Sequence, residues 1–242
     1  MHLFILCPPF SGSTVLYKIL NSSPHISTFL EKIVTVKLND KVSDIYVHKG
    51  EGQFLYELYG DPEKSKNYSI NRHKPNYKIP IEDMDNVWKQ HWEMSKKIKC
   101  EKSPPFVHFA NQIENYYGKN NIKFIIMIRN PYACRWNKNV PNWNVFAQKQ
   151  KENLTQLKNT ILVRYEDLVT DPEILKRKIL NFLPELENID MYVGKIDGLS
   201  AVSGARNQEI TTEFRDRILD KEMKNKYLNR ELLEYFGYNF IN

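Results

Sequence analysis

A short loop near the amino terminus carries the residue types that bind anions. Residues 8–14 read Pro-Pro-Phe-Ser-Gly-Ser-Thr and lie between a β-rich apolar run and a stretch with helical apolar spacing. A helix that begins near Ser13 presents free backbone N–H groups and the positive end of its dipole to this loop, and Gly12 allows close approach of the backbone. We therefore expect this loop to bind an anion, and a phosphate in particular. The stretch also fits an ordinary turn with a hydroxyl cap, so other residues must decide.

Two common phosphate-binding motifs are absent. The loop of nucleotide triphosphatases needs Gly-x-x-x-x-Gly-Lys-Ser/Thr, and no Gly-Lys-Ser/Thr occurs in the chain. The dinucleotide pattern Gly-x-Gly-x-x-Gly is missing as well. These absences disfavour a P-loop nucleotide kinase and a dinucleotide-dependent enzyme.

The sequence from Pro8 to Leu16 resembles the 5′-phosphosulfate loop of sulfotransferases, usually written Pro-Arg-Ser-Gly-Thr-Thr followed by apolar residues. The resemblance implies a donor, 3′-phosphoadenosine 5′-phosphosulfate (PAPS), held by the loop. The implied contacts are Phe10, Ser11, Gly12, Ser13 and Thr14.

Phe10 departs from the family pattern, because it stands where sulfotransferases have a basic residue. Loss of one group that stabilises developing negative charge typically costs about 3 to 4 kcal/mol. Either Lys102 or Lys18 compensates, or the protein binds the nucleotide without fast turnover.

Arg129 follows the clearest apolar run of the chain, residues 123–128, and begins Arg-Asn-Pro. This resembles the 3′-phosphate element of sulfotransferases, Ile-x-Arg-Asn/Asp-Pro, and implies that Arg129 binds the 3′-phosphate of the donor. A guanidinium fork suits a terminal phosphate because it can donate two parallel hydrogen bonds. The family usually has a serine eight residues further on, where this chain has Asn137.

A late loop rich in small residues, 198–207, resembles the glycine-containing loop that closes over the 3′-phosphate in the same superfamily. The contacts implied are Ser203, Gly204 and Arg206.

Two further residues match catalytic positions of the family. Lys102, in Glu-Lys-Ser-Pro, resembles the Lys-x-Pro element of several carbohydrate and tyrosylprotein sulfotransferases, whose lysine points at the transferring group. Glu31 follows the Pro24-His25-Ile26 turn, where sulfotransferases have a glutamate in the acceptor pocket. The resemblance therefore implies that Lys102 neutralises charge on the transferring group and that Glu31 removes the proton of the acceptor. Without that context, Glu31 reads as a solvated residue.

Another motif, from Val163 to Pro172, resembles the family's Val-x-Tyr-Glu-Asp-Leu followed by Asp-Pro. We expect it to be architectural, with Asp171 capping a helix.

Four apolar runs alternate with helical patterns, which predicts a parallel sheet with helices on both faces. The runs are followed by the loop at 8–14, Lys102, Arg129 and the Tyr-Glu-Asp-Leu motif. The resemblance adds a P-loop-like three-layer α/β fold. The expected strands and helices are 3–6, 98–100, 123–128 and 161–163, and 13–20, 82–97, 106–117, 145–157 and 172–183.

Composition is that of a globular domain. The 242 residues are 41% hydrophobic, and the formal charge of +6 is spread along the chain without the basic stripe or module of a nucleic-acid binder. The three cysteines show no metal-type pairing, and Cys7 and Cys100 fit buried strand ends. The longest apolar run is too short for a membrane span, and no leader pattern precedes the loop, so we expect a cytoplasmic protein.

We therefore expect residues 1–242 to form a single sulfotransferase-like domain in which residues 32–97 are an acceptor-binding or lid insertion. Its reaction would be in-line transfer of a sulfuryl group from PAPS, without a metal, to a hydroxyl or amine of a carbohydrate, peptide, lipid or small alcohol. A nucleotide-binding protein of this fold without turnover is the main alternative, and a P-loop nucleotide kinase the lesser one.

Overall fold

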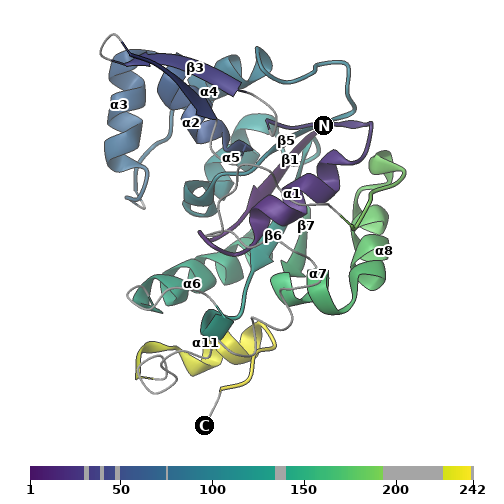
Figure 1. The fold of residues 1–242 in the computed structure, drawn as a ribbon. Coiled ribbons are helices and arrows are strands. Elements are labelled where there is room, and N and C mark those ends of the chain that lie inside the picture. Colours follow the sequence, from purple (N-terminus) through teal and green to yellow (C-terminus); the bar gives the residue numbers. More distant parts are fainter. Residues whose placement is uncertain are drawn as a thin grey trace.

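Helices surround a five-stranded, all-parallel sheet with the strand order β2-β5-β1-β6-β7 (Figure 1). The computed structural model describes residues 1–29, 33–38, 41–46, 50–74, 76–133, 140–192 and 226–240. The strands are β1 (His2–Leu6), β2 (Ile26–Ser27), β5 (Ile98–Glu101), β6 (Ile122–Ile128) and β7 (Thr160–Arg164). The predicted α/β class with a central parallel sheet is confirmed. Four strands lie where the apolar runs predicted them, whereas β2 has only two residues, too few to produce a pattern in the sequence.

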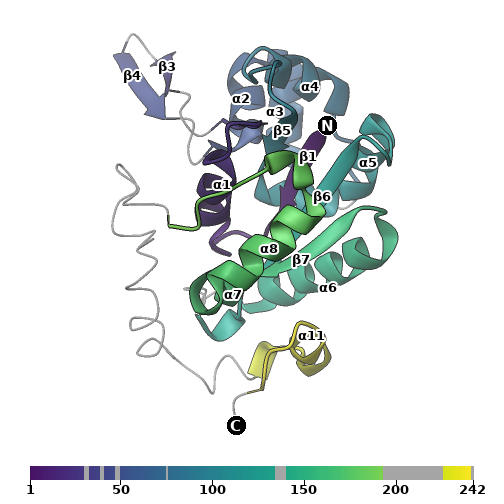
Figure 2. The same cartoon turned by 90° about the vertical axis from the view of Figure 1, so that its right-hand side faces the viewer.

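The two faces of the sheet bury alternate residues of each strand, because successive side chains of a strand point to opposite sides. On one face, Leu3 and Ile5 of β1 pack with α1 (Ser13–Asn21) and α8 (Pro172–Phe182). On the other, Phe4 and Leu6 pack with a second group of helices. These are α2 (Gly52–Tyr59), α4 (Ile81–Lys89), α5 (Ala110–Tyr117) and the end of α6 (Val140–Gln156). Helices thus cover both faces, as Figures 1 and 2 show from two sides.

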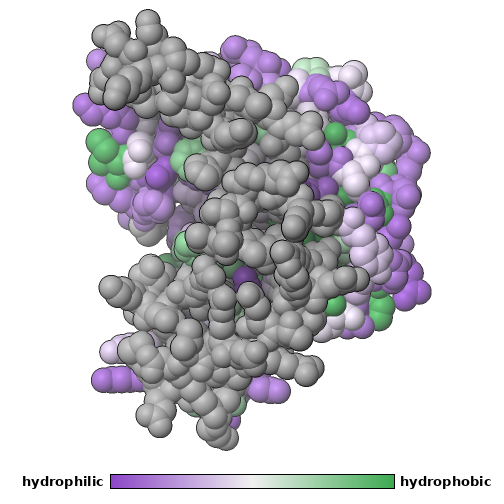
Figure 3. Space-filling view, in the orientation of Figure 1, coloured by the Kyte–Doolittle hydropathy of each residue, from purple (hydrophilic) through white to green (hydrophobic). Residues whose placement is uncertain are grey.

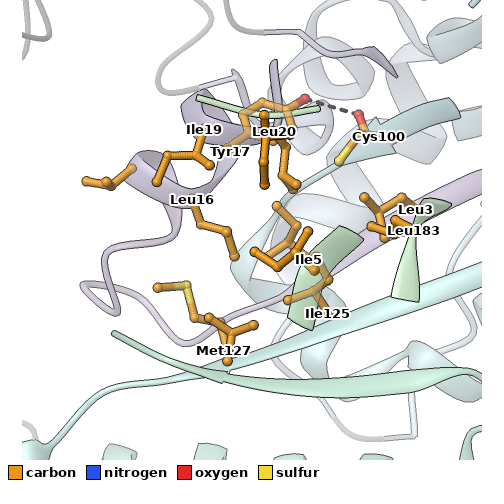
Figure 4. Close-up of a cluster of buried hydrophobic side chains, with 14 of the residues drawn as sticks. Leu3, Ile5, Leu16, Tyr17, Ile19, Leu20, Cys100, Ile125, Met127 and Leu183 are labelled. Atoms are coloured by element: carbon orange, nitrogen blue, oxygen red, sulfur yellow. Dashed lines mark hydrogen bonds between the residues drawn. The ribbon is translucent and has the colours of Figure 1, made fainter. Parts of the chain in front are cut away.

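Helix α1 is tied to the sheet by more than apolar contacts. The hydroxyl of Tyr17 donates to the carbonyl of Cys100, at 3.0 Å, and accepts the N–H of Phe29, at 2.8 Å. Figure 4 shows the first of these bonds above the apolar side chains of α1 and the sheet. Cys7 and Cys100 are buried, as predicted. Helix α1, which follows the loop at 8–14, is therefore fixed against β5 and the chain that follows β2.

Residues 50–97 contain three helices, of which the sequence analysis expected only one, starting near residue 82. Helices α2 and α3 (Pro62–Asn71) are followed by α4, which ends at Lys89. The prediction of one helix over residues 82–97 is wrong, because the chain turns after α4. Trp92, beyond the helix, is buried and its indole N–H donates to the carbonyl of Cys100 at 3.2 Å. Before this region, β3 (Ile33–Leu38) and β4 (Lys41–Tyr46) form a separate antiparallel pair.

The remaining elements follow the predicted order with small shifts in their ends. Short 3-10 helices, Pro104–His108, Pro131–Ala133 and Pro184–Leu186, lie after β5, β6 and α8, and α7 (Tyr165–Thr170) and α11 (Arg230–Tyr235) complete the described elements. Pro172 begins α8 as predicted, but Asp171 makes no capping hydrogen bond to that helix and instead accepts one from the hydroxyl of Thr170 at 3.0 Å.

The surface of the described part is mostly hydrophilic on the side of α8 in the view of Figure 3, with scattered apolar residues. None of the described helices is long and apolar enough to cross a membrane.

The connections place a topological switch between β1 and β6. The chain leaves β1 through α1 toward β2 on one side of the sheet, and leaves β6 through α6 toward β7 on the other. In open parallel sheets, ligands bind at such a switch, beyond the carboxyl ends of the strands. The loop at 8–14 and Arg129 both follow these two strands.

Candidate active site

The loop between β1 and α1 has the backbone shape of an anion site. Phe10 and Gly12 both have a positive φ, of 62° and 83°, and the N–H of Ser11 donates to the carbonyl of Pro8 at 3.3 Å. Gly12 is the N-cap of α1, and no side chain caps this helix. The hydroxyl cap of an ordinary turn is thus not formed, and the first N–H groups of α1 lack a side-chain acceptor from the cap position.

Ser11 and Gly12 lie in closely packed surroundings. Ser11 is only 2% exposed, and its buried hydroxyl has no hydrogen-bond partner among the described residues. A Cβ atom at Gly12 would lie 2.1 Å from Cδ2 of Tyr165. Since such a contact is impossible, only glycine lets the loop approach the tyrosine ring this closely.

Arg129 lies over the same ring. The parallel pairing of β6 and β7 sets Ile128 opposite Arg164, so the next residues, Arg129 and Tyr165, leave the sheet side by side. The guanidinium carbon lies 4.1 Å from the centroid of the Tyr165 ring, and Nη1 donates to the carbonyl of Phe10 at 3.3 Å. A cation over an aromatic face is attracted by the quadrupole of the ring. One tyrosine thus contacts both the Arg129 side chain and the loop.

Glu166 supports the segment after β6 from the same motif. Its carboxylate accepts the N–H of Asn130 at 2.9 Å, and burial raises its pKa above the ordinary value for glutamate. Tyr165 and Glu166 thus both contact the segment around Arg129, while the architectural role expected for Tyr-Glu-Asp-Leu stays a prediction.

Lys102 lies directly after β5 with its side chain 1% exposed. Its ammonium forms an ion pair with Oε1 of Glu51 at 2.9 Å, and the other oxygen of Glu51 accepts a hydrogen bond from the side chain of Gln53 at 2.6 Å. The charge of Lys102 is therefore paired with a carboxylate from the start of α2.

The thiol of Cys7, at the end of β1, is also buried, which raises its pKa to about 12 and keeps it protonated.

Contacts with the end of β5 hold the first turn of α2. The side chain of Glu101 is fully buried and accepts the N–H of Gly52 at 2.7 Å and the hydroxyl of Ser103 at 2.5 Å. The indole of Trp88 donates to the carbonyl of Gly52 at 2.8 Å. Burial raises the pKa of Glu101 to about 8. These bonds fix the position of Glu51 beside Lys102.

No motif in the sequence pointed to Glu51. It lies between two glycines, and its partner Lys102 is 51 residues away. The contact of Tyr165 with Gly12 was also missed, although the strand predicted at 161–163 placed this tyrosine at the correct edge of the sheet.

Five of the residues expected in the site lie outside the described residues. They are Glu31, Asn137, Ser203, Gly204 and Arg206. Of the others, Phe10, Gly12 and Arg129 are brought into one group of contacts around Tyr165, while Lys102 is paired separately with Glu51. Within the described ranges, no group of three or more His, Cys, Asp or Glu residues could hold a metal ion.

Comparisons with known proteins agree with this architecture. A sequence model of the sulfotransferase family matches residues 2–187. A search of curated proteins gives no match. Among solved structures, the chain is similar to the sulfotransferase domain from the curacin biosynthetic pathway, with a TM-score of 0.51, 19% identity, and 99% and 98% coverage of the two chains. It is also similar to a sulfotransferase from Alicyclobacillus acidocaldarius, with a TM-score of 0.52, 12% identity, and 98% and 96% coverage.

The two structural likenesses, at these identities, concern the fold, while the family match covers most of the chain, including the loop at 8–14, Lys102, Arg129 and the Tyr165 motif. The chain belongs to the sulfotransferase family.

Proposed function

We propose that this sulfotransferase uses PAPS as its donor and binds it across the carboxyl ends of β5, β1 and β6. The observation that carries the proposal is the position of three motifs on these adjacent strands. Lys102 follows β5, the loop at 8–14 follows β1 and Arg129 follows β6, so the sheet brings all three to one edge. They surround the switch point at which a parallel sheet binds ligands.

The loop would hold the 5′-phosphosulfate. The N–H groups at the start of α1 have no side-chain cap, and the buried hydroxyl of Ser11 has no partner within the described segments. Both features suit a bound anion, since a buried polar group without a partner is costly and a helix start attracts negative charge. Ser13 and Thr14 would add their hydroxyls.

Arg129 would bind the 3′-phosphate. Its guanidinium lies over Tyr165 and against the carbonyl of Phe10, so its side chain is already directed toward the loop. Asn137, Ser203, Gly204 and Arg206 would complete the 3′-phosphate contacts, as the family pattern implies.

Lys102 would donate to the bridging oxygen between phosphorus and sulfur or to the sulfuryl oxygens. An ammonium carries three N–H donors, and the ion pair with Glu51 uses one of them. Burial strengthens the remaining electrostatic interaction with an anion, because the local dielectric constant is low. As the acceptor oxygen forms its bond to sulfur, the bond between sulfur and the bridging oxygen breaks. The electron pair stays on that oxygen, where Lys102 neutralises the new charge.

We assign the reaction with the acceptor to Glu31 and to residues 32–97. Glu31 would take the proton that the acceptor hydroxyl or amine loses when its bond to sulfur forms. Residues 32–97 would bind the acceptor or cover it, as part of a single domain formed by residues 1–242. Glu51 connects this region to the chemistry, because it is the residue that pairs with Lys102.

Phe10 leaves the loop without the basic side chain of the family pattern. Phe10 is 56% exposed, and its carbonyl oxygen is the group that contacts Arg129. Because Arg129 is assigned to the 3′-phosphate, the missing charge beside the 5′-phosphosulfate would come from Lys102 or Lys18. Either lysine would keep the donor site functional in spite of the missing basic residue.

Calorimetric titration with 3′-phosphoadenosine 5′-phosphate (PAP), the product of the donor, tests the proposal. We expect wild-type protein to bind PAP with micromolar affinity and to bind ATP poorly. Arg129→Ala should weaken PAP binding at least about 100-fold, because a charge-assisted bidentate contact contributes about 3 kcal/mol. Arg177→Ala, which removes an exposed arginine on α8, is the matched control and should bind as wild type.

If the wild type does not bind PAP, the proposed donor site is wrong, and the proposed use of PAPS is rejected with it. If PAP binds but no sulfate is transferred from labelled PAPS to any of a set of carbohydrate, peptide, lipid and alcohol acceptors, the protein is a nucleotide-binding member of the family without turnover.

A further inference from the structure

We propose that Tyr238, near the carboxyl end of the chain, is a positioning residue for recognition of the 3′-phosphate. It acts through Glu166 and the peptide group that follows Arg129. The inference rests on the proposed donor site. The family match ends at residue 187, so Tyr238 lies outside it.

The peptide group between Arg129 and Asn130 is held at both of its polar atoms. The indole N–H of Trp143 donates to the carbonyl of Arg129 at 3.0 Å, and the N–H of Asn130 donates to Oε1 of Glu166 at 2.9 Å. Because the peptide group is planar, two bonds on opposite sides fix its orientation. They thereby fix the direction in which the side chain of Arg129 leaves the backbone.

Glu166 is in turn held by Tyr238. The phenol donates to Oε2 of Glu166 at 2.9 Å, so the two carboxylate oxygens connect Tyr238 to the N–H of Asn130. A hydrogen bond to a buried carboxylate contributes more than one between neutral groups. Without the phenol, Glu166 loses the bond that holds its second oxygen, and the carboxylate can rotate away from Asn130.

The carboxyl-terminal segment is built to bring Tyr238 to this point. Helix α11 packs on the end of β6, where Leu232, Leu233 and Phe236 share a buried cluster with Ile128 and Trp143. Gly237, with a φ of 74°, then reverses the chain, and the N–H of Tyr238 donates to the carbonyl of Leu233 at 2.9 Å. Tyr238 itself is 5% exposed. Its hydroxyl therefore reaches Glu166 from a fixed backbone.

The experiment compares two nucleotides that differ in the 3′-phosphate. We would measure the affinities of wild type, Tyr238→Phe and Tyr235→Phe for PAP and for adenosine 5′-phosphate, which lacks that group. Tyr235→Phe removes the hydroxyl of an exposed tyrosine on α11 and is the matched control. We expect Tyr238→Phe to weaken PAP binding at least about fivefold and to leave the affinity for adenosine 5′-phosphate unchanged, since one hydrogen bond to a charged group is lost.

A second variant, Glu166→Gln, removes the negative charge that strengthens both hydrogen bonds and should show the same selective loss. Thermal unfolding of each variant checks that it is folded at the temperature of the titration. Equal losses for both nucleotides would indicate general loosening of the structure and would overturn the inference, as would PAP binding by Tyr238→Phe at the wild-type affinity. If wild-type protein binds PAP no more tightly than adenosine 5′-phosphate, the proposed role of Arg129 fails and the inference fails with it. Loss of PAP binding in Arg129→Ala but not in Tyr238→Phe or Glu166→Gln would reject the inference alone.

Discussion

At the scale of single residues, Gly12 has the least freedom to change. It combines a left-handed backbone with a ring of Tyr165 so close that no Cβ atom fits. Any other residue would be strained by its own backbone and would also push the ring from its place beside Arg129. The residue therefore controls two parts of the candidate donor site at once.

Gly12→Ala should lower the free energy of unfolding by more than about 1–2 kcal/mol from the backbone alone, and should weaken PAP binding at least about tenfold as Tyr165 moves. Gly118→Ala is the matched control, because Gly118 also has a positive φ, of 81°, but its nearest neighbour, Nδ2 of Asn121, lies 3.6 Å from the added Cβ. We expect this control to lose stability and to keep its PAP affinity. Equal PAP affinities in the two variants would show that the contact with Tyr165 does not support the site.

The raised pKa of Glu101 predicts that the stability of the protein depends on pH. Burial raises its pKa from 4.5 to about 8, so in the folded protein it keeps its proton over a range in which the unfolded chain has lost it. Below pH 4.5 both states are protonated. As the pH rises from 4.5 to about 8, the unfolded state is favoured increasingly, and the stability contributed by the protonated Glu101 is lost. Above that range, the folded state carries a buried charge near Lys102 and Glu51.

Glu101→Gln should remove this loss, because the amide oxygen can accept the same bonds from Gly52 and Ser103. Urea unfolding at pH 5, 6.5 and 8 measures this effect. With rising pH, the free energy of unfolding of the variant should increase relative to that of the wild type, by at least about 1 kcal/mol at pH 8. Glu93→Gln, at a position whose side chain is 65% exposed, should follow the wild type. A constant difference between Glu101→Gln and wild type across this range would contradict the assignment.

At the scale of elements, α1 matters because its first turn faces the proposed donor. The Tyr17 hydroxyl connects this helix to β5 and to Phe29 after β2, the two places from which Lys102 and Glu31 follow. A single buried hydroxyl thus connects the helix after the loop to the two chain segments that precede Lys102 and Glu31, the catalytic residues that the sequence predicts.

Tyr17→Phe should reduce the free energy of unfolding by about 1–3 kcal/mol, since the buried N–H of Phe29 and the carbonyl of Cys100 each lose a partner. Tyr56→Phe is the control, because the Tyr56 hydroxyl is also buried but has no partner in the described part of the chain. We expect that control to be as stable as the wild type or slightly more so. Chemical denaturation gives both values, and equal losses would refute the role of the Tyr17 bonds.

The elements that the sequence predicted well were those whose patterns are local. The apolar run before Arg129 and the helical spacing after Gly12 depend on neighbouring residues, and both elements are present. Residues 50–97 were predicted poorly because their helices are held by distant contacts, such as that of Trp88 with Gly52, 36 residues away. Glu51 was missed for the same reason.

At the scale of the whole molecule, motif order was the most informative feature of the sequence. In a parallel sheet, every strand delivers its carboxyl end to one edge, so residues far apart in the sequence come together once the strands are known. This explains why Lys102 and Arg129 could be placed at the same edge as the loop, while the contacts of Tyr165 required the strand order and register. That residues 1–242 form one domain stays a prediction.

The pairing of β6 with β7 also limits how the length of this chain can vary. Arg129 meets Tyr165 because Ile128 is paired with Arg164, and each residue added within β6 would either shift that pairing or carry the arginine one step past the ring. A shift by one residue exchanges the two faces of a strand. Insertions and deletions are thus confined to the connections, and a homologue that differs in length between β6 and its arginine would need a different partner for that side chain.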